Sequence, residues 1–351
     1  MLKKIGLVLW SVCLMMSTSA QAVVILQYHH VSEKTPKSTS VTVAQFKEQM
    51  AYLANNGYQV IPLTDAVADI KNKRPSKPKT IALTFDDGYD SIYNNVAPVL
   101  EHYQFPYTVF VPVKPVNDGY HGVMTWAQIK ALSQRGATIA NHSWAHEHMI
   151  RLQDNETQAQ WLQREEKNLL AAEADIKRHT GQSVKMLAYP YGEYNTQIEA
   201  LLTKHGFVGF GQQSGAAGPH SILTALPRFP IAAGYADLNE LKVKFASLNM
   251  PVLAQTPTNP QLDQGQWRPT LTVTIDTKDI YPNQLMCYVQ GQGANKPKWI
   301  SDNQFSVQAV VDLPAGRSRY NCTAPSKTRA GYYWFSQAWV RPKNDGSWIK
   351  E

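Results

Sequence analysis

The sequence predicts an α/β protein with a distorted (β/α) barrel over residues 23–250, followed by a small all-β sandwich. Two observations support the barrel. Strand-like and helix-like segments alternate throughout that range, which is typical of a parallel sheet, and its length fits an approximate barrel better than an open sheet. A third observation supports the sandwich, because only strand-like segments follow Met250.

Residues 1–22 are predicted to be a signal peptide and not part of the fold. Lys3 and Lys4 precede an apolar run, and Ala20-Gln21-Ala22 has the small-residue pattern of a cleavage site. The run is too short to favour a membrane span, and no later stretch is apolar enough for one. We therefore expect an exported protein, periplasmic or secreted, with an uncleaved anchor as the alternative.

Charge and cysteine content narrow the classes of partner. Removal of Lys3 and Lys4 lowers the formal net charge of +7 by two. This mild basic balance suits an anionic envelope or polymer, but it is too diffuse to predict nucleic-acid binding. Removal of Cys13 leaves Cys287 and Cys322, which we expect to form a disulfide in an oxidising compartment.

The barrel elements are expected from apolar spacing and from stop signals. The helix at 43–56, for example, has Phe46, Met50 and Leu53 at helical spacing, and Gly57 follows as a stop. Short apolar runs bounded by turn residues indicate the strands. We expect strands at 23–30, 58–63, 80–85, 107–111, 137–142, 185–191, 207–210 and 228–231, and helices at 43–56, 91–103, 125–135, 156–179, 196–205 and 238–248.

The composition changes after Met250. Residues 251–268 are rich in proline, glutamine and asparagine and are predicted to be a linker. The sandwich is expected at 269–351, with strands at 270–275, 286–290, 304–312 and 332–340.

Polar side chains follow four of the predicted strands. In a parallel barrel the carboxyl ends of all strands lie on one face, where active sites collect. These side chains can therefore converge. They are His29-His30, Asp86-Asp87, the segment from Asn141 to His146, and the segment from Tyr189 to Gly192.

Two pairs of these residues indicate a metal site. Adjacent carboxylates at Asp86 and Asp87 require either a cation between them or a raised pKa. His142 and His146 are four residues apart, and on one helical turn both imidazoles would face the same side. A histidine pair alone is as often structural, but two histidines with a carboxylate form a common hydrolytic metal site. The two pairs together therefore favour a metal centre.

The motifs carry a family resemblance. Thr84-Phe85-Asp86-Asp87-Gly88 and His142-Ser143-Trp144-Ala145-His146 resemble the first two motifs of the polysaccharide deacetylases, carbohydrate esterase family 4, which have the NodB-homology fold. Pro190-Tyr191-Gly192 is similar to the end of the third motif. The resemblance covers about residues 23–250.

The resemblance implies a role for each motif residue. Asp87, His142 and His146 would hold a divalent metal, with Zn²⁺ preferred and Co²⁺, Ni²⁺ or Fe²⁺ as alternatives. Asp86 would be the general base. The backbone amide of Tyr191 would stabilise the oxyanion, the alternative being a turn tyrosine without a catalytic role.

The sequence departs from the family pattern at two positions. Many members have an arginine that pairs with the base where this chain has Ala188. We expect Arg228 to replace it, the alternative being that Arg228 is a surface residue.

The second departure concerns the general acid, because the late Leu-x-His motif of many members is absent between residues 221 and 250. Tyr28-His29-His30-Val31 resembles the poly-β-1,6-N-acetylglucosamine deacetylases of biofilm systems, in which the first strand supplies the acid. This assigns the acid to His29, with His30 as the alternative, since strand alternation would point only one of them into the site. The other histidines singled out are expected to be ordinary surface or loop residues: His102, His148, His179, His205 and His220.

The sequence therefore predicts metal-dependent hydrolysis of N-acetyl groups from an N-acetylglucosamine polysaccharide, with release of acetate and with the poly-β-1,6-linked polymer favoured. The alternatives are a chitooligosaccharide or peptidoglycan N-deacetylase, and a glycan-binding envelope protein without catalysis. The C-terminal region carries five tryptophans that either fill the sandwich core, which we favour, or form a platform that contacts glycan: Trp267, Trp299, Trp334, Trp339 and Trp348.

Overall fold

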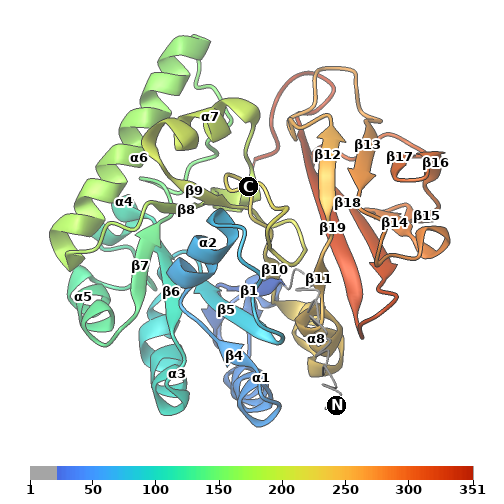
Figure 1. Ribbon diagram of the computed structural model, residues 1–351. Coiled ribbons are helices and arrows are strands. Elements are labelled where there is room, and N and C mark those ends of the chain that lie inside the picture. The colour runs from blue at the N-terminus through green and yellow to red at the C-terminus, as the bar shows by residue number, and fades with distance from the viewer. Residues whose placement is uncertain (1–21, 351) are drawn as a thin grey trace, which may run out of the picture.

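The computed structural model describes residues 22–350 (Figure 1). The predicted signal peptide, residues 1–22, lies outside the described residues except for Ala22. Within residues 22–350, no helix combines the length and the apolar character needed to cross a membrane.

A curved parallel sheet forms the first part of the chain. Its strand order is β10-β1-β5-β6-β7-β8-β9, with β4 beside β5. A parallel bridge between Phe210 and Leu226 joins β9 to the segment just before β10, so the two ends of the sheet approach each other. The predicted distorted barrel is confirmed. Its strands are β1 (Val23–Tyr28), β4 (Gln59–Val60), β5 (Thr80–Phe85), β6 (Tyr107–Val111), β7 (Thr138–Asn141), β8 (Met186–Ala188), β9 (Val208–Phe210) and β10 (Phe229–Pro230).

Helices surround this sheet, and the long helix α6 runs along its outer side (Figure 1). Three of them begin with a capping box, in which Thr42, Thr125 or Thr157 exchanges hydrogen bonds with a glutamine three residues later. The helices are α1 (Val43–Asn55), α2 (Leu63–Lys71), α3 (Ala97–Tyr103), α4 (Val113–Asn117), α5 (Trp126–Gln134), α6 (Gln158–Thr180), α7 (Thr196–His205) and α8 (Leu238–Phe245).

One expected helix contains a π-helical turn. The segment predicted as a helix at 91–103 is helical throughout, and a π-helical turn at Ile92–Val96 runs directly into α3. Pro98 follows this turn at the start of α3. In a regular α-helix a proline removes a hydrogen bond and clashes with the preceding turn.

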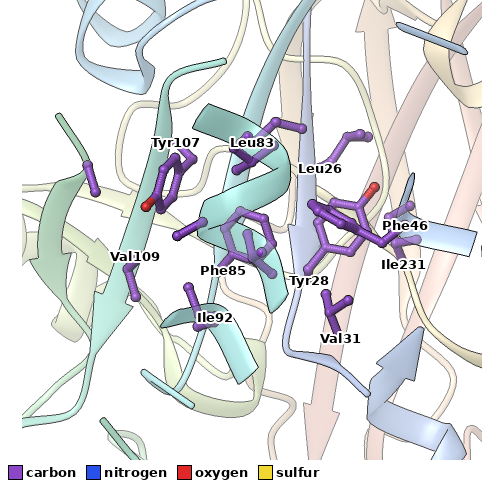
Figure 2. Close-up of a cluster of buried hydrophobic side chains, with 14 of the residues drawn as sticks. Leu26, Tyr28, Val31, Phe46, Leu83, Phe85, Ile92, Tyr107, Val109 and Ile231 are labelled. Atoms are coloured by element: carbon purple, nitrogen blue, oxygen red, sulfur yellow. The ribbon is translucent and has the colours of Figure 1, made fainter. Parts of the chain in front are cut away.

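An aromatic cluster fixes the carboxyl ends of β1 and β5 (Figure 2). The ring centroids of Tyr28 and Phe85 lie 5.3 Å apart, and Phe46 of α1 packs edge-on against Tyr28 at 5.4 Å. The buried Tyr28 hydroxyl donates to Gln49 Oε1 at 2.8 Å, so its burial leaves no unsatisfied donor. The two strands are thereby held in register immediately before His29 and Asp86.

Two sheets form the C-terminal sandwich, which lies beside the barrel (Figure 1). One hydrophobic core contains side chains of both sheets. Cys287 and Cys322 face each other on neighbouring strands and form a disulfide. The first sheet contains β11 (Leu248–Asn249), β19 (Tyr332–Arg341), β18 (Gly316–Pro325), β14 (Met286–Val289) and β15 (Gly293–Asn295), and the second contains β12 (Val252–Thr256), β13 (Thr270–Ile275), β17 (Gln304–Gln308) and β16 (Lys298–Ser301).

The segment 251–268, expected to be a linker, is structured. Residues Val252–Thr256 form the strand β12 at the edge of the second sheet, and Leu262 and Trp267 are buried in the sandwich core. As an edge strand, β12 is largely exposed, so its residues lack the apolar alternation of a buried strand. The polar residues of this segment lie mainly after β12, whose own sequence is Val-Leu-Ala-Gln-Thr, and buried Leu262 and Trp267 anchor that part to the sandwich.

The tryptophans of this region have different environments. Trp267 and Trp339 are buried in the sandwich core, and Trp299 packs against it. Trp334 packs edge-on against Phe229 of β10, with ring centroids 5.2 Å apart. Trp348 lies under the Arg151 guanidinium. Trp267, Trp299 and Trp339 therefore fill the sandwich core, whereas Trp334 and Trp348 contact the barrel.

We expect loss of the disulfide to destabilise the sandwich. Cys287 and Cys322 are 35 residues apart, and cross-linking a loop of this length stabilises a fold by about 4 kcal/mol in the chain-entropy model. The double variant Cys287→Ala/Cys322→Ala should therefore unfold at a lower temperature in scanning calorimetry. Reductant should lower the unfolding temperature of the wild-type protein and leave that of the variant unchanged. Equal unfolding temperatures for the two proteins without reductant would contradict this expectation.

Candidate active site

The carboxyl ends of β1, β5, β7 and β8 bring the motif residues to one edge of the barrel sheet. Backbone hydrogen bonds extend beyond the last strand residues and fix these ends. Asp86 N donates to Tyr28 O at 2.9 Å, and His142 N donates to Val111 O at 3.1 Å. The polar residues that follow the strands are thus held by the sheet itself.

Three of these side chains form a compact group of potential metal ligands. One ligand atom from each of Asp87, His142 and His146 lies within 4.8 Å of the others. The Nε2 atoms of His142 and His146 are 3.0 Å and 3.1 Å from Asp87 Oδ1. His142 is buried, whereas the side chain of His146 is 25% exposed, so the group is open on one side.

The hydrogen bonding of His142 shows that this group suits a cation. Its Nδ1 lies 2.7 Å from the carbonyl oxygen of Ala188, which can only accept, so Nδ1 carries a proton. In the neutral ring Nε2 is then an unprotonated acceptor, and it faces another acceptor, Asp87 Oδ1. A positive charge between the two atoms removes this conflict, and a carbonyl that orients the imidazole from behind is typical of metal-binding histidines.

The pKa values of these groups agree with a site for positive charge. Burial would raise the pKa of Asp87, but its hydrogen bonds with His142 and His146 hold that pKa well below the usual range. Burial would lower the pKa of His142, but the interactions with Asp87 and Asp86 together outweigh it and raise that pKa. The carboxylate is therefore ionised and ready to bind a cation.

The two histidines converge by a different route from the one expected. Residues 142–147 form a loop and not a helical turn, with positive φ at Ser143 (67°) and His146 (57°). Glu147 organises this loop by accepting hydrogen bonds from Ser143 Oγ at 2.9 Å and from Ala145 N at 2.7 Å. Ser143 Oγ in turn accepts from His146 N at 3.0 Å. Sequence reasoning missed Glu147, although it directly follows the motif.

Backbone strain is concentrated at the same place. Asp87, His146 and Tyr191 are non-glycine residues with φ of 69°, 57° and 58°. Such left-handed conformations cost free energy for residues with a Cβ atom, and they cluster at functional sites where the surroundings enforce them.

Asp86 forms a buried ion pair. Arg228 Nη1 and Nη2 donate to Asp86 Oδ1 and Oδ2 at 2.7 Å and 2.8 Å, and neither side chain is exposed. Gln27 Nε2 donates to Asp86 Oδ2 at 2.6 Å. Burial would raise the pKa of Asp86, but the Arg228 charge leads the interactions that lower it. The alternative that Arg228 is a surface residue is wrong, and Gln27 is a partner of Asp86 that sequence reasoning missed.

Both histidines after β1 lie near the carboxylates. β1 ends at Tyr28 and β2 (His30–Val31) begins two residues later, so strand alternation does not separate His29 from His30. His29 lowers the pKa of both Asp86 and Asp87. The His30 ring stacks on Tyr89 with centroids 3.5 Å apart. The expectation that only one of the two approaches the site is not supported.

Tyr191 is held between the two parts of the molecule. It lies in the turn Pro190–Gly192, and its ring stacks on His148 with centroids 3.8 Å apart. The ring also packs against His146 at 4.6 Å, and the Arg317 guanidinium of β18 lies 5.4 Å from its centroid. The structure thus places Tyr191 beside a metal-site histidine and in contact with the sandwich.

Glu193 connects the residues around Tyr191. This buried carboxylate pairs with His148 Nδ1 at 2.8 Å, Arg151 Nη2 at 3.2 Å and Arg317 Nη1 at 3.3 Å. His148, which was expected to be an ordinary surface or loop residue, is therefore a support of the Tyr191 ring. Its position two residues after His146 was the available signal.

We expect the Asp86–Arg228 pair to show strong energetic coupling. Arg228→Met leaves the Asp86 charge buried without its ion-pair partner, and such a change costs about 3–5 kcal/mol in the free energy of unfolding. Asp86→Asn leaves Arg228 uncompensated. In urea denaturation, the loss of unfolding free energy in the double variant should be at least about 2 kcal/mol smaller than the sum of the losses in the two single variants. Arg74→Met, which breaks the exposed pair with Asp69, is the control and should cost under about 1 kcal/mol. Additive losses would contradict the ion pair.

Comparison with known proteins agrees with this geometry. A family model for polysaccharide deacetylases matches residues 73–210. YxkH of Bacillus subtilis (strain 168), a protein named as a polysaccharide deacetylase, is 30% identical over 212 residues, which cover 60% of this chain and 71% of that protein. The poly-β-1,6-N-acetyl-D-glucosamine N-deacetylase of Escherichia coli (strain K12) is 27% identical over 246 residues. That match covers 60% of this chain but only 36% of the Escherichia coli protein.

A solved structure supports the barrel fold. The Streptococcus pyogenes deacetylase PplD, determined in complex with acetate, has a TM-score of 0.58 and 21% sequence identity. The alignment covers 65% of this chain and 99% of that chain. The sequence relationship to YxkH, which extends over most of that protein, establishes what the motifs and the fold indicate: this chain belongs to the polysaccharide deacetylase family.

Proposed function

We propose that this protein hydrolyses N-acetyl groups of an N-acetylglucosamine-containing polysaccharide and releases acetate in a reaction that depends on a divalent metal. The observation that carries the proposal is the division between the two neighbouring carboxylates. Asp87 lies with His142 and His146, while Asp86 is held by Arg228 next to them. This arrangement provides metal ligands and a separate base at one point.

Asp87, His142 and His146 would hold the metal. Two imidazole nitrogens and one carboxylate oxygen suit Zn²⁺ and leave a position open for water or substrate, while Co²⁺, Ni²⁺ and Fe²⁺ also accept such ligands. When bound, a divalent metal supplies Lewis-acid chemistry, because it lowers the pKa of water and polarises a carbonyl group.

The remaining residues would move protons and stabilise charge. Asp86, kept ionised and oriented by Arg228, accepts the proton of the water that attacks the N-acetyl carbonyl carbon. The backbone N–H of Tyr191 donates to the oxyanion that forms on the carbonyl oxygen. His29 donates a proton to the sugar nitrogen as the C–N bond breaks, so that acetate and a free amine leave. His30 is the alternative acid, since it is also close enough to Asp87 to feel its charge.

The substrate proposed first is the poly-β-1,6-linked polymer. The Escherichia coli relative is named for that polymer, and Tyr28-His29-His30 resembles the corresponding motif of such deacetylases. Chitooligosaccharides and peptidoglycan remain the competing substrates. We also propose that the chain is exported, with residues 1–22 as its signal peptide and two domains divided near Met250; the disulfide fits an oxidising compartment.

We expect the purified protein to release acetate from β-1,6-linked N-acetylglucosamine oligomers in the presence of added Zn²⁺ or Co²⁺. Removal of the metal by a chelator should abolish the release, and renewed addition should restore it. Acetate is quantified by an enzyme-coupled assay, with β-1,4-linked oligomers and peptidoglycan in parallel. Tight binding of an oligomer without acetate from any substrate would support a glycan-binding protein instead.

Two variants should distinguish the role of the general base from that of the metal ligands. We expect Asp86→Asn to lower kcat by at least about 100-fold, in the range of a lost general base, while the metal content per chain stays unchanged. His142→Ala should lose metal when measured by plasma mass spectrometry after dialysis, because one of three ligands is removed. His102→Ala, a change on the distant helix α3, is the matched control. Loss of metal in Asp86→Asn would argue against the division of roles.

A further inference from the structure

A cleft of about 460 Å³ lies beside Tyr191, on the face of the barrel where the motif residues meet. Its walls come from both parts of the molecule. The barrel contributes Tyr191, Gln212 and Pro230, which belong to the segments at the ends of β8, β9 and β10. The sandwich contributes Gln290, Arg317 and Arg319. The volume is within the range of small-molecule sites, and the cleft adjoins the residues of the proposed reaction.

Arg319 is a partly buried cation in this wall. Its Nη1 donates to the carbonyl oxygen of Gln212 at 3.4 Å. Within residues 22–350, no carboxylate forms an ion pair with it. Burial lowers the pKa of Arg319, which shows that the surroundings disfavour its charge. A guanidinium withdrawn from water without a counter-ion is costly, and an anion beside it would recover that cost.

A neighbouring lysine increases the positive charge. Burial lowers the pKa of Lys244 to about 8; attraction to Glu240 opposes this effect, and repulsion from Arg319 adds a smaller lowering. The Lys244 Nζ lies 4.8 Å from the centroid of the Tyr235 ring. Two cations that repel each other at partly buried positions are stabilised together by one bound anion.

Arg317 adds a second guanidinium to the cleft. It lies over Tyr191 and pairs with Glu193, but that carboxylate also pairs with Arg151 and His148. One negative charge is therefore shared among several cationic groups. Among residues 22–350, the charged groups that line the cleft are Glu193, Arg317 and Arg319.

We propose that this cleft binds a carboxylate carried by the glycan, on a sugar unit next to the one that loses its acetyl group. The planar guanidinium of Arg319 can donate two parallel hydrogen bonds to a carboxylate. Gln290 and the Tyr191 turn border the space for the sugar ring. This inference rests on the proposed function, and it makes the sandwich part of the substrate site. A polymer of neutral units alone would leave the Arg319 charge without a carboxylate partner among residues 22–350.

The test compares two modified oligosaccharides that differ in charge. β-1,6-linked N-acetylglucosamine pentamers are prepared with O-carboxymethyl groups or with O-carboxamidomethyl groups, which have almost the same shape but no charge. Binding to the full-length protein is measured by calorimetry at low ionic strength, and acetate release is measured separately. We expect the Kd of the carboxymethyl pentamer to be about tenfold lower, the difference that one charge-assisted hydrogen-bonded pair supplies. Added salt should reduce this ratio.

Variants test whether Arg319 causes the difference between the two Kd values. Arg319→Gln should reduce the ratio of the two Kd values to about one, and Arg319→Lys should retain part of it, because the charge remains without the planar fork. Arg74→Gln makes the same chemical change at an exposed arginine after α2 and should keep the full ratio. Equal Kd values for the two pentamers, or a ratio that survives in Arg319→Gln, would overturn the inference. Absence of acetate from every oligomer, with the Kd ratio intact, would instead reject the proposed function.

Discussion

The buried ion pair between Asp86 and Arg228 is the interaction on which the geometry of the site depends. It joins the end of β5 to the segment that enters β10, at opposite sides of β1 in the sheet. Both partners are fully buried, and the Arg228 Nε also donates to Gly211 O at 3.0 Å. Two buried charges are stable in this environment because every oxygen of Asp86 accepts a hydrogen bond.

This ion pair explains how two adjacent carboxylates can have different roles. Asp86 continues the alternation of β5 and points inward to Arg228, whereas Asp87 has a left-handed backbone and turns toward His142 and His146. Their charges are compensated by different partners, so neither needs to be protonated. A base that already has a firmly bound cationic partner also has less tendency to become a metal ligand itself.

Much of this arrangement follows from the sequence, because parallel strands deliver their carboxyl ends to one face. The alternation of elements predicted the barrel, and the apolar run before Asp86 predicted β5. The distant pairing of Arg228 with Asp86 was expected only through the family resemblance and the substitution at Ala188. The loop around His146 was not predictable from helical spacing, since it depends on hydrogen bonds from Ser143 and Ala145 to Glu147. The structured segment 251–268 was missed because its strand is short and does not alternate apolar and polar residues, and because mostly polar residues follow it.

The sandwich is connected to the site through the Tyr191 turn, where Arg317 and His148 both pair with Glu193.

The central claim is that Asp87, His142 and His146 form a metal centre from which Asp86 is kept apart by Arg228. X-ray absorption spectroscopy of the metal-loaded protein tests it most directly. The account predicts two imidazole nitrogens at about 2.0–2.1 Å and one protein carboxylate oxygen, with a spectrum that Asp86→Asn leaves unchanged. A spectrum that indicates fewer than two imidazole ligands would contradict this claim. A change in the carboxylate ligation of the metal in Asp86→Asn would also contradict it.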